Sequence, residues 1–455
     1  MHFTELLARL ERCGIALTPD GEWASRQRRL PEELLFEILD HLRSDRSALK
    51  TCSCVCRSWC TYLTPILFRR ISWPPCHSAW YDAFRVSTRC PRRNGYHRSN
   101  ATTIDVLYKN LSRSARVRTA VQELRLRGEC CSAGELLSFE KVRAMVTLLP
   151  QMSALELREI RSDDDQFAPP IKPALRELRI FEQYCTPEIA VHAMHFFSRI
   201  DRLVIGSFNA VFDPIPIDHR PPERPSLHVR ALATAFEDDG SAARHLDGRR
   251  DARPFCLYLD PLALRELTLC NPFRPYMAPL AGSWPDLRSL AYILGEDTPR
   301  LAPQAARTLR SLTLGMRLAP FVEFATDRTV EEWVVDGWAY MLRDLKDTRA
   351  VGIHELEIVF LFGCHANRDT ARTLDTVLRQ KDWDSLERVL VRRFPQLQRV
   401  RLQAGSHGRA WAPAMDILER CSEVVGTVAE SMFSSRIASI LDIGIVSHRY
   451  PELGY

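Results

Sequence analysis

The sequence lacks the features that mark several large classes of protein. No apolar run reaches the roughly 18 residues that a membrane-spanning helix needs. Residues 1–12 alternate apolar with charged side chains, which predicts an amphipathic helix rather than a signal peptide. There is no Gly-rich phosphate loop, no nucleophile elbow and no His-Glu-x-x-His helix, and the 13 histidines are scattered. We therefore expect a chain with no membrane contact and no cofactor.

Long runs of one charge are also missing. Lys and Arg number 62 against 57 Asp and Glu, the formal charge is +5, and the two signs are mixed. This balance gives no support to nucleic-acid binding. Arg26, Arg28 and Arg29 are predicted to be solvated surface, with a nuclear import signal as the alternative. Fourteen cysteines without a secretory signal predict reduced thiols in the cytoplasm or nucleus.

Four cysteines nevertheless gather in one short segment, Cys52, Cys54, Cys56 and Cys60. Residues two apart on a helix face away from each other, and no Cys-x-x-Cys pair or nearby histidine completes a tetrahedral zinc site. Free cysteine usually packs as a small hydrophobic residue, so no metal is predicted. Catalytic groups can still converge from distant segments, which keeps an enzyme or metal-binding protein as an alternative of a different class.

The segment from Leu30 to Ile71 organises the N-terminal part of the chain. Pro31 suits the first turn of a helix, and the glutamates that follow it suit the positive end of the helix dipole. On that helix an apolar stripe spans roughly 140°, more than one neighbouring helix would cover. The stripe consists of Leu34, Leu35, Ile38, Leu39 and Leu42.

Two further helices, over residues 44–52 and 54–63, are predicted to cover part of this stripe. The side chains expected to do so are Leu49, Val55, Trp59 and Leu63. A unit of roughly 40 residues buries too little surface to be secure alone, and leftover apolar surface usually marks a binding site. The apolar surface that these helices leave uncovered therefore predicts a protein partner.

This segment resembles the F-box proteins. The resemblance rests on Leu30-Pro31, Glu33-Leu34-Leu35, Ile38-Leu39, Leu42 and Val55-Cys56-Arg57-x-Trp59, with Ala48 and Cys54 departing from the usual pattern. It implies that the three helices bind the Skp adaptor, and through it the cullin, of Skp-cullin-F-box ubiquitin ligases. The adaptor-binding residues it implies are Leu30, Pro31, Leu34, Leu35, Ile38, Leu39, Leu42, Val55, Cys56 and Trp59.

From residue 121 onward one short phrase returns, of the type LRELRIF or LRSLTLG. Most repeats lie about 22 to 31 residues apart, and two of the wider gaps are about twice 22. Each phrase alternates as a strand does, and helical patterns occur between phrases, for example over residues 330–345 and 373–390. The anchor residues of the phrases are Leu124, Leu155, Leu178, Leu203, Leu267, Leu290, Leu312, Leu356 and Val400.

Strand and helix at a short fixed period predict a solenoid with a parallel sheet. The phrases resemble degenerate leucine-rich repeats, with only Cys270 and Asn271 near the position where such repeats usually seal the turn. The predicted fold is therefore α/β, a three-helix F-box followed by an irregular leucine-rich-repeat-like arc. The predicted divisions are 1–29 (helix and basic spacer), 30–72 (F-box), 73–120 (linker and helix) and 121–455 (repeats), with an irregular insertion at 209–254 and a cap from residue 424.

The residue after each anchor is predicted to point to the exposed face of the sheet, because side chains alternate along a strand. Arg125, Glu156 and Arg179 are expected to support one another across strands. Thr268, Ala291 and Thr313 are expected to leave a small uncharged surface for a substrate protein. The predicted function is a non-catalytic substrate receptor of a ubiquitin ligase, with an F-box scaffold outside ubiquitination as the alternative.

Overall fold

The computed structural model describes residues 32–43, 45–73, 104–127, 138–158, 171–181, 193–206, 227–235, 259–260, 262–269, 284–295, 303–318, 329–348, 350–363, 366–406 and 415–446. The predicted N-terminal helix, the basic spacer, Leu30 and Pro31 lie outside these residues. So do Cys270 and Asn271 and most of the predicted linker.

Three helices form the N-terminal unit: α2 (Glu32–His41), α3 (Arg46–Ser53) and α4 (Arg57–Phe68). Asp45 caps α3 by accepting hydrogen bonds from the backbone N–H groups of Ser47 and Ala48 at 3.0 and 2.9 Å. Helix α4 continues through Pro65 and so runs past the end predicted at residue 63. A small core of its own joins the three helices, formed by Leu39, Leu49, Leu63 and Leu67.

The rest of the described chain is built on one parallel sheet of twelve strands, which lie in the sheet in the order of the chain. Every neighbouring pair is parallel, as predicted. The strands are β1 (Arg70–Trp73), β2 (Glu123–Arg127), β3 (Ala154–Arg158), β4 (Lys172–Phe181), β5 (Phe197–Gly206), β6 (His228–Ala235), β7 (Glu266–Leu269), β8 (Ser289–Ile293), β9 (Ser311–Arg317), β10 (Glu355–Phe362), β11 (Arg399–Ser406) and β12 (Leu441–Val446).

The predicted anchors stand side by side across this sheet. Leu124 pairs with Leu155, Leu155 with Leu178, and the column continues through to Val400. Three strands of the column were not predicted, and their anchor positions hold Ile71, Leu232 and Leu441. Because side chains two apart point to the same face, the register places every anchor on one side of the sheet.

One prediction about the spacing was wrong. The interval 209–254 was predicted to be an insertion, but residues 228–235 form β6, which pairs with β5 and β7. The two gaps of about twice 22 residues contain the helices that the patterns over residues 330–345 and 373–390 predicted. In the described chain each gap is one long crossover, with α12 (Val330–Asp347) in the first and α13 (Arg368–Arg379) and α14 (Trp383–Arg393) in the second.

The predicted boundaries at both ends of the sheet also shift. Strand β1 spans the expected limit at residue 72 and brings Trp73 into the large core. Helix α6 (Ile104–Arg113) is the helix predicted within residues 73–120, and it adds Ile104 and Leu111 to the same core. At the C-terminal end, α15 (Met415–Met432) and α16 (Ser435–Ala438) lead into β12, which extends the sheet as its last strand instead of folding over it.

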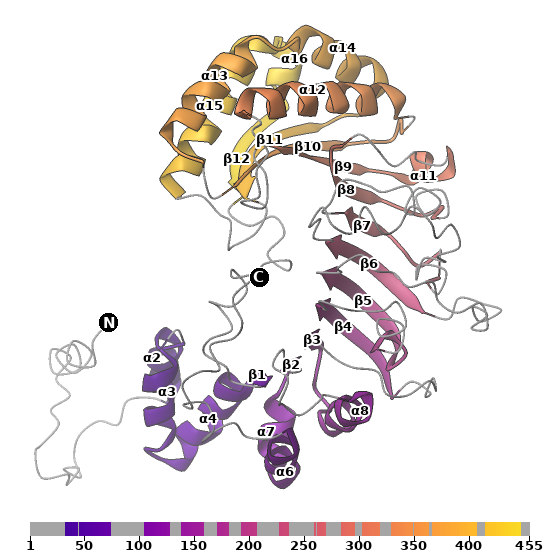
Figure 1. Cartoon of the computed structure of the whole chain (residues 1–455). Helices are drawn as coiled ribbons and strands as arrows, with labels where there is room; N and C mark the ends of the chain where they lie inside the picture. Colours follow the sequence, from indigo (N-terminus) through magenta and orange to yellow (C-terminus); the bar gives the residue numbers. More distant parts are fainter. Residues whose placement is uncertain are drawn as a thin grey trace, which may run out of the picture.

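The sheet lines the inside of an open arc, and the helices cover its outside (Figure 1). The outer layer includes α8 (Phe139–Leu148), α11 (Pro303–Thr308) and α12 to α16. The large core lies between these helices and the anchor face of the sheet. Gly337 allows α12 to approach β9, because a Cβ atom there would stand 2.5 Å from Cγ of Met316. The opposite side of the sheet, which is not covered by the helices of the outer layer named above, is called the inner face below.

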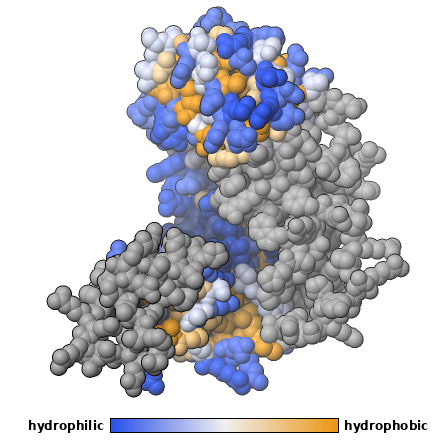
Figure 2. Space-filling model, turned by 90° about the vertical axis from the view of Figure 1, so that its left-hand side faces the viewer, coloured by the Kyte–Doolittle hydropathy of each residue, from blue (hydrophilic) through white to orange (hydrophobic). Residues whose placement is uncertain are grey.

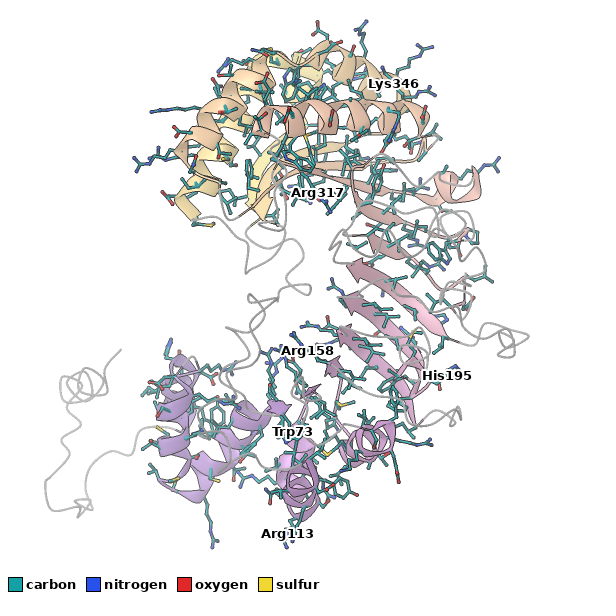
Figure 3. All side chains as sticks on the ribbon, viewed as in Figure 1. Trp73, Arg113, Arg158, His195, Arg317 and Lys346 are labelled. Carbon is teal, nitrogen blue, oxygen red and sulfur yellow. The ribbon has the colours of Figure 1, made fainter. Side chains whose placement is uncertain are left out.

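The helical unit joins the sheet without a loop. Only Arg69 separates the end of α4 from the start of β1, and α4 also contacts α7 (Ala115–Ala120). Arg46 of α3 donates to the backbone oxygen of Leu67 at 2.9 Å. Trp73, at the end of β1, lies at this junction (Figure 3). The three helices are therefore held in a defined orientation at one end of the arc.

Candidate functional site

The three-helix unit divides the predicted adaptor-binding residues into two groups. Leu39 is 2% exposed and forms part of the small core, so its role is to hold the helices together. Leu42 and Trp59 pack against that core and are half-buried, as is Ile38. Leu34 and Leu35 lie in α2, and only their backbone is described.

Among the members whose side chains are described, Val55 and Cys56 are exposed. The side chain of Val55 is 63% exposed, although it was predicted to pack against the first helix. The turn between α3 and α4 holds it outward, because the N–H of Cys54 donates to Thr51 and that of Val55 to Cys52, each at 3.1 Å. Cys56, also exposed, caps α4 by accepting from the N–H of Trp59 at 3.5 Å. An apolar side chain fixed in water by a capped turn is available to a partner.

The sequence did not predict how the helices are cross-linked. Phe36 of α2 stacks on Tyr62 of α4 with ring centroids 3.9 Å apart. The Tyr62 hydroxyl donates to Oδ1 of Asp40 at 2.7 Å, and Arg43 also bonds that carboxylate. The hydrogen bond from Tyr62 lowers the pKa of Asp40 against the opposing effect of burial, and Arg43 adds to the lowering. The signal was the i, i+4 spacing of Phe36 and Asp40, which puts both on one face of α2.

The cysteines of this unit are free thiols. Cys54 and Cys56 are exposed, whereas burial raises the pKa of the half-buried Cys52. Among the described residues, no three His, Cys, Asp or Glu side chains are grouped so as to hold a metal ion. Cys421 of α15 is fully buried, and burial raises the pKa of its thiol to about 12.

Thiol alkylation should separate these cysteines. With iodoacetamide near pH 8, Cys54 and Cys56 are expected to react within minutes, because they are exposed, while Cys421 stays unmodified until the protein unfolds. Peptide mass spectrometry with and without denaturant measures the difference. Modification of native Cys421 at the rate of Cys56 would contradict the packing of α15.

The predicted substrate patch does not have the exposure expected of it. Ala291 is 7% exposed and Thr313 is 3% exposed, and only Thr268 is half-buried. The three do pair side by side through β7, β8 and β9, as predicted. Thr313 donates through Oγ1 to Oε2 of Glu357 at 3.1 Å, so the longer side chain of the next strand shields it. The patch is part of the inner face but offers little contact surface.

The N-terminal third of the inner face is a ladder of ion pairs. Arg125 lies 3.3 Å from Glu156, and Arg179 lies 3.9 Å from the same carboxylate, which confirms the predicted cross-strand support. Arg70 adds a bond to Glu123 at 2.5 Å. We call this group the arginine ladder; it comprises Arg70, Glu123, Arg125, Glu156, Arg158, Glu177 and Arg179.

Glu123 should make the ladder sensitive to acid. Burial raises the pKa of Glu123, but hydrogen bonds and charges from Arg125 and Arg70 outweigh it and leave the pKa lowered. A lowered folded-state pKa adds stability above the unfolded value of about 4.3, and this is lost as the pH falls through the folded value. Thermal melts from pH 6 to pH 3 should therefore show Glu123→Gln less stable than wild type at pH 6, with the gap closing below about pH 4. A gap that widens in acid would contradict the pairing.

Together these features define a class of protein: a long parallel sheet covered by helices on one side, with a small helical unit fixed at its end that holds an apolar side chain in water. In the described residues no helix is both long and apolar enough to cross a membrane.

The comparison with family models agrees with the helical unit. A model of the F-box-like family matches residues 27–72. These residues cover α2, α3, α4 and most of β1. A search of curated proteins finds no match to the chain. The family match supports a role in the protein interactions of F-box domains, which typically bind Skp adaptors and are typically non-catalytic.

Proposed function

We propose that the chain is the non-catalytic substrate-recognition subunit of a Skp-cullin-F-box ubiquitin ligase. The F-box binds the Skp adaptor, the adaptor links it to the cullin, and the inner face of the arc holds the protein to be modified. The observation that carries this proposal is the exposed Val55 on the α3–α4 turn, inside the segment that matches the F-box-like family. The ligase would work in the cytoplasm or nucleus.

The adaptor contact has a simple energetic basis. Burying an exposed valine side chain contributes on the order of 1.5 kcal/mol or more, and neighbouring apolar groups add to it. Ile38 is half-buried in the same unit, and Cys54 and Cys56 are exposed on either side of Val55. The buried core of Leu39, Leu49 and Leu63 keeps this surface in place without taking part in the contact.

The direct join of α4 to β1 supports the second half of the proposal. A receptor raises the rate of ubiquitin transfer by keeping its target near the enzyme that carries ubiquitin, and this effective concentration falls when the link is long and flexible. Contact of α4 with α7 and the bond from Arg46 to Leu67 fix the adaptor side relative to the inner face. A target on that face would thus be presented in one orientation.

Reconstitution tests the function. The full chain is co-expressed with the Skp adaptor, cullin and its ring partner, and proteins that co-purify are incubated with ubiquitin and its activating and conjugating enzymes. We expect the adaptor to co-purify and ubiquitin to be attached to a bound protein. Adaptor binding with no transfer to any bound protein would instead support a scaffold outside ubiquitination.

A further inference from the structure

The arginine ladder is layered. Its three glutamate side chains are only 6% to 18% exposed, whereas its four arginine side chains are 24% to 57% exposed. The carboxylates therefore lie close to the sheet, and the guanidinium groups lie above them toward solvent. Figure 3 shows Arg158 on the inner side of the arc, and Figure 2 shows hydrophilic residues in the recess between the two ends of the molecule.

The glutamates accept their contacts from arginines of the ladder itself. Glu156 is contacted by Arg125 at 3.3 Å, by Arg158 at 2.7 Å and by Arg179 at 3.9 Å. Its side chain is 6% exposed, so solvent and ligands reach little of it. These bonds fix the orientation of the arginine side chains. Less side-chain entropy is then lost when a ligand binds to them.

The arginines have more N–H donors than the carboxylates of the ladder use. A guanidinium has five N–H donors. Among the described residues, Glu123 binds Nε and Nη2 of Arg125, each at 2.7 Å, and Glu177 binds Nη2 of Arg179 at 3.0 Å, while Nη1 of Arg179 lies 3.9 Å from Glu156. The side chains of Arg125 and Arg179 are 31% and 24% exposed, so an anion on the solvent side could form charge-assisted bonds with the N–H groups that the carboxylates do not use.

The opposite end of the sheet provides a contrast. Arg399 and Arg401 both pair with Asp442 on the inner face, but there the carboxylate is 42% exposed, as much as its partners at 44% and 30%. That group presents both charges to solvent. Of these two groups, the N-terminal ladder is the one that presents a layer of one sign.

We propose that the arginine ladder binds an acidic segment of the substrate protein, with carboxylates or phosphates as the anionic groups. This rests on the proposed function, because it names the substrate chemistry that the inner face would select. A nucleic acid is a poorer fit: four arginines lie against three glutamates, whereas polyphosphate binding needs a separate cation for each phosphate neutralised. A short peptide needs only a few direct bonds.

Fluorescence anisotropy of a labelled probe tests this on the full chain. The probe is a twelve-residue peptide in which Asp and Glu alternate with Gly and Ser, and a second version carries phosphoserine. We expect at least one version to bind and the affinity to fall with added salt. Arg125→Gln with Arg179→Gln should weaken binding roughly tenfold, as loss of charge-assisted bonds predicts. Comparing the versions shows which anion is preferred.

Two further variants keep the test decisive if that double variant is unstable. Glu177→Gln removes the negative charge that now pairs with Nη2 of Arg179 at 3.0 Å, and should tighten peptide binding. Arg399→Gln with Arg401→Gln removes the same charges from the other end and should leave affinity unchanged. Binding of neither peptide, equal loss in both double variants, or tighter binding of a 20-base-pair DNA duplex would overturn the proposal.

Adaptor capture is measured on the same proteins to keep the two proposals separate. The ladder variants should all retain it, because their side chains lie on the sheet and not on the helical unit. Failure of wild-type chain to capture the adaptor would defeat the proposed function while peptide binding is scored independently.

Discussion

Replacing Val55 with aspartate is expected to weaken binding of the Skp adaptor by roughly two orders of magnitude. Val55 is 63% exposed in the free chain, so the substitution should leave folding almost untouched. In the complex the new carboxylate would be desolvated without a partner, and that cost falls entirely on binding. Pull-down of purified adaptor by the full chain over a concentration series gives the two affinities.

Val351 supplies a matched control. It is also a valine, 59% exposed, and lies between α12 and β10, in the part of the arc remote from the helical unit. Val351→Asp introduces the same charge on a surface of similar exposure, and adaptor binding should be unchanged. Equal weakening by both variants would mean that the charge acts nonspecifically, and no effect of Val55→Asp would remove the α3–α4 turn from the interface.

Truncating Leu312 to alanine is expected to destabilise the arc by about 2–5 kcal/mol. Leu312 is 1% exposed on β9, and its register neighbours are Leu290 and Leu356, so its loss leaves a cavity beneath three strands. Leu262 is 61% exposed and serves as the control. Leu262→Ala should change the free energy of unfolding by no more than about 0.5 kcal/mol. Thermal and denaturant unfolding measure both, and similar losses would contradict the assigned column.

The strand column was predictable because it follows from period-two alternation around leucine. That signal locates Leu124 through Val400 in correct register without any knowledge of the crossovers. It missed Leu232 because prolines precede β6 and a charge cluster follows it, and both read as loop. It missed Ile71 because the same residues continue the F-box pattern. In both places the local sequence pattern fits two structures, and only pairing with the neighbouring strands in the folded sheet selects the strand.

The site was less predictable, because periodicity gives the face of a side chain but not its depth. Thr313 and Ala291 do lie on the inner face, yet strands about 4.8 Å apart bring longer neighbours close enough to cover short side chains. Glu357 covers Thr313 in this way. For the same reason the layers of the arginine ladder could not be predicted. The sequence predicted that the charges pair across strands, but not that the arginines would be more exposed than the glutamates. Val55 differed for a local reason, since the turn after α3 directs it outward.

Amide hydrogen exchange of the full chain, with and without the Skp adaptor, tests the central claim most directly because it locates the contact. We expect the adaptor to slow exchange in α2, α3 and α4 and across the turn that carries Val55, and to leave α12 to α15 unchanged. Protection confined to the arc, with exchange in the α3–α4 turn unaltered at saturating adaptor, would contradict the assignment of the helical unit as the docking site.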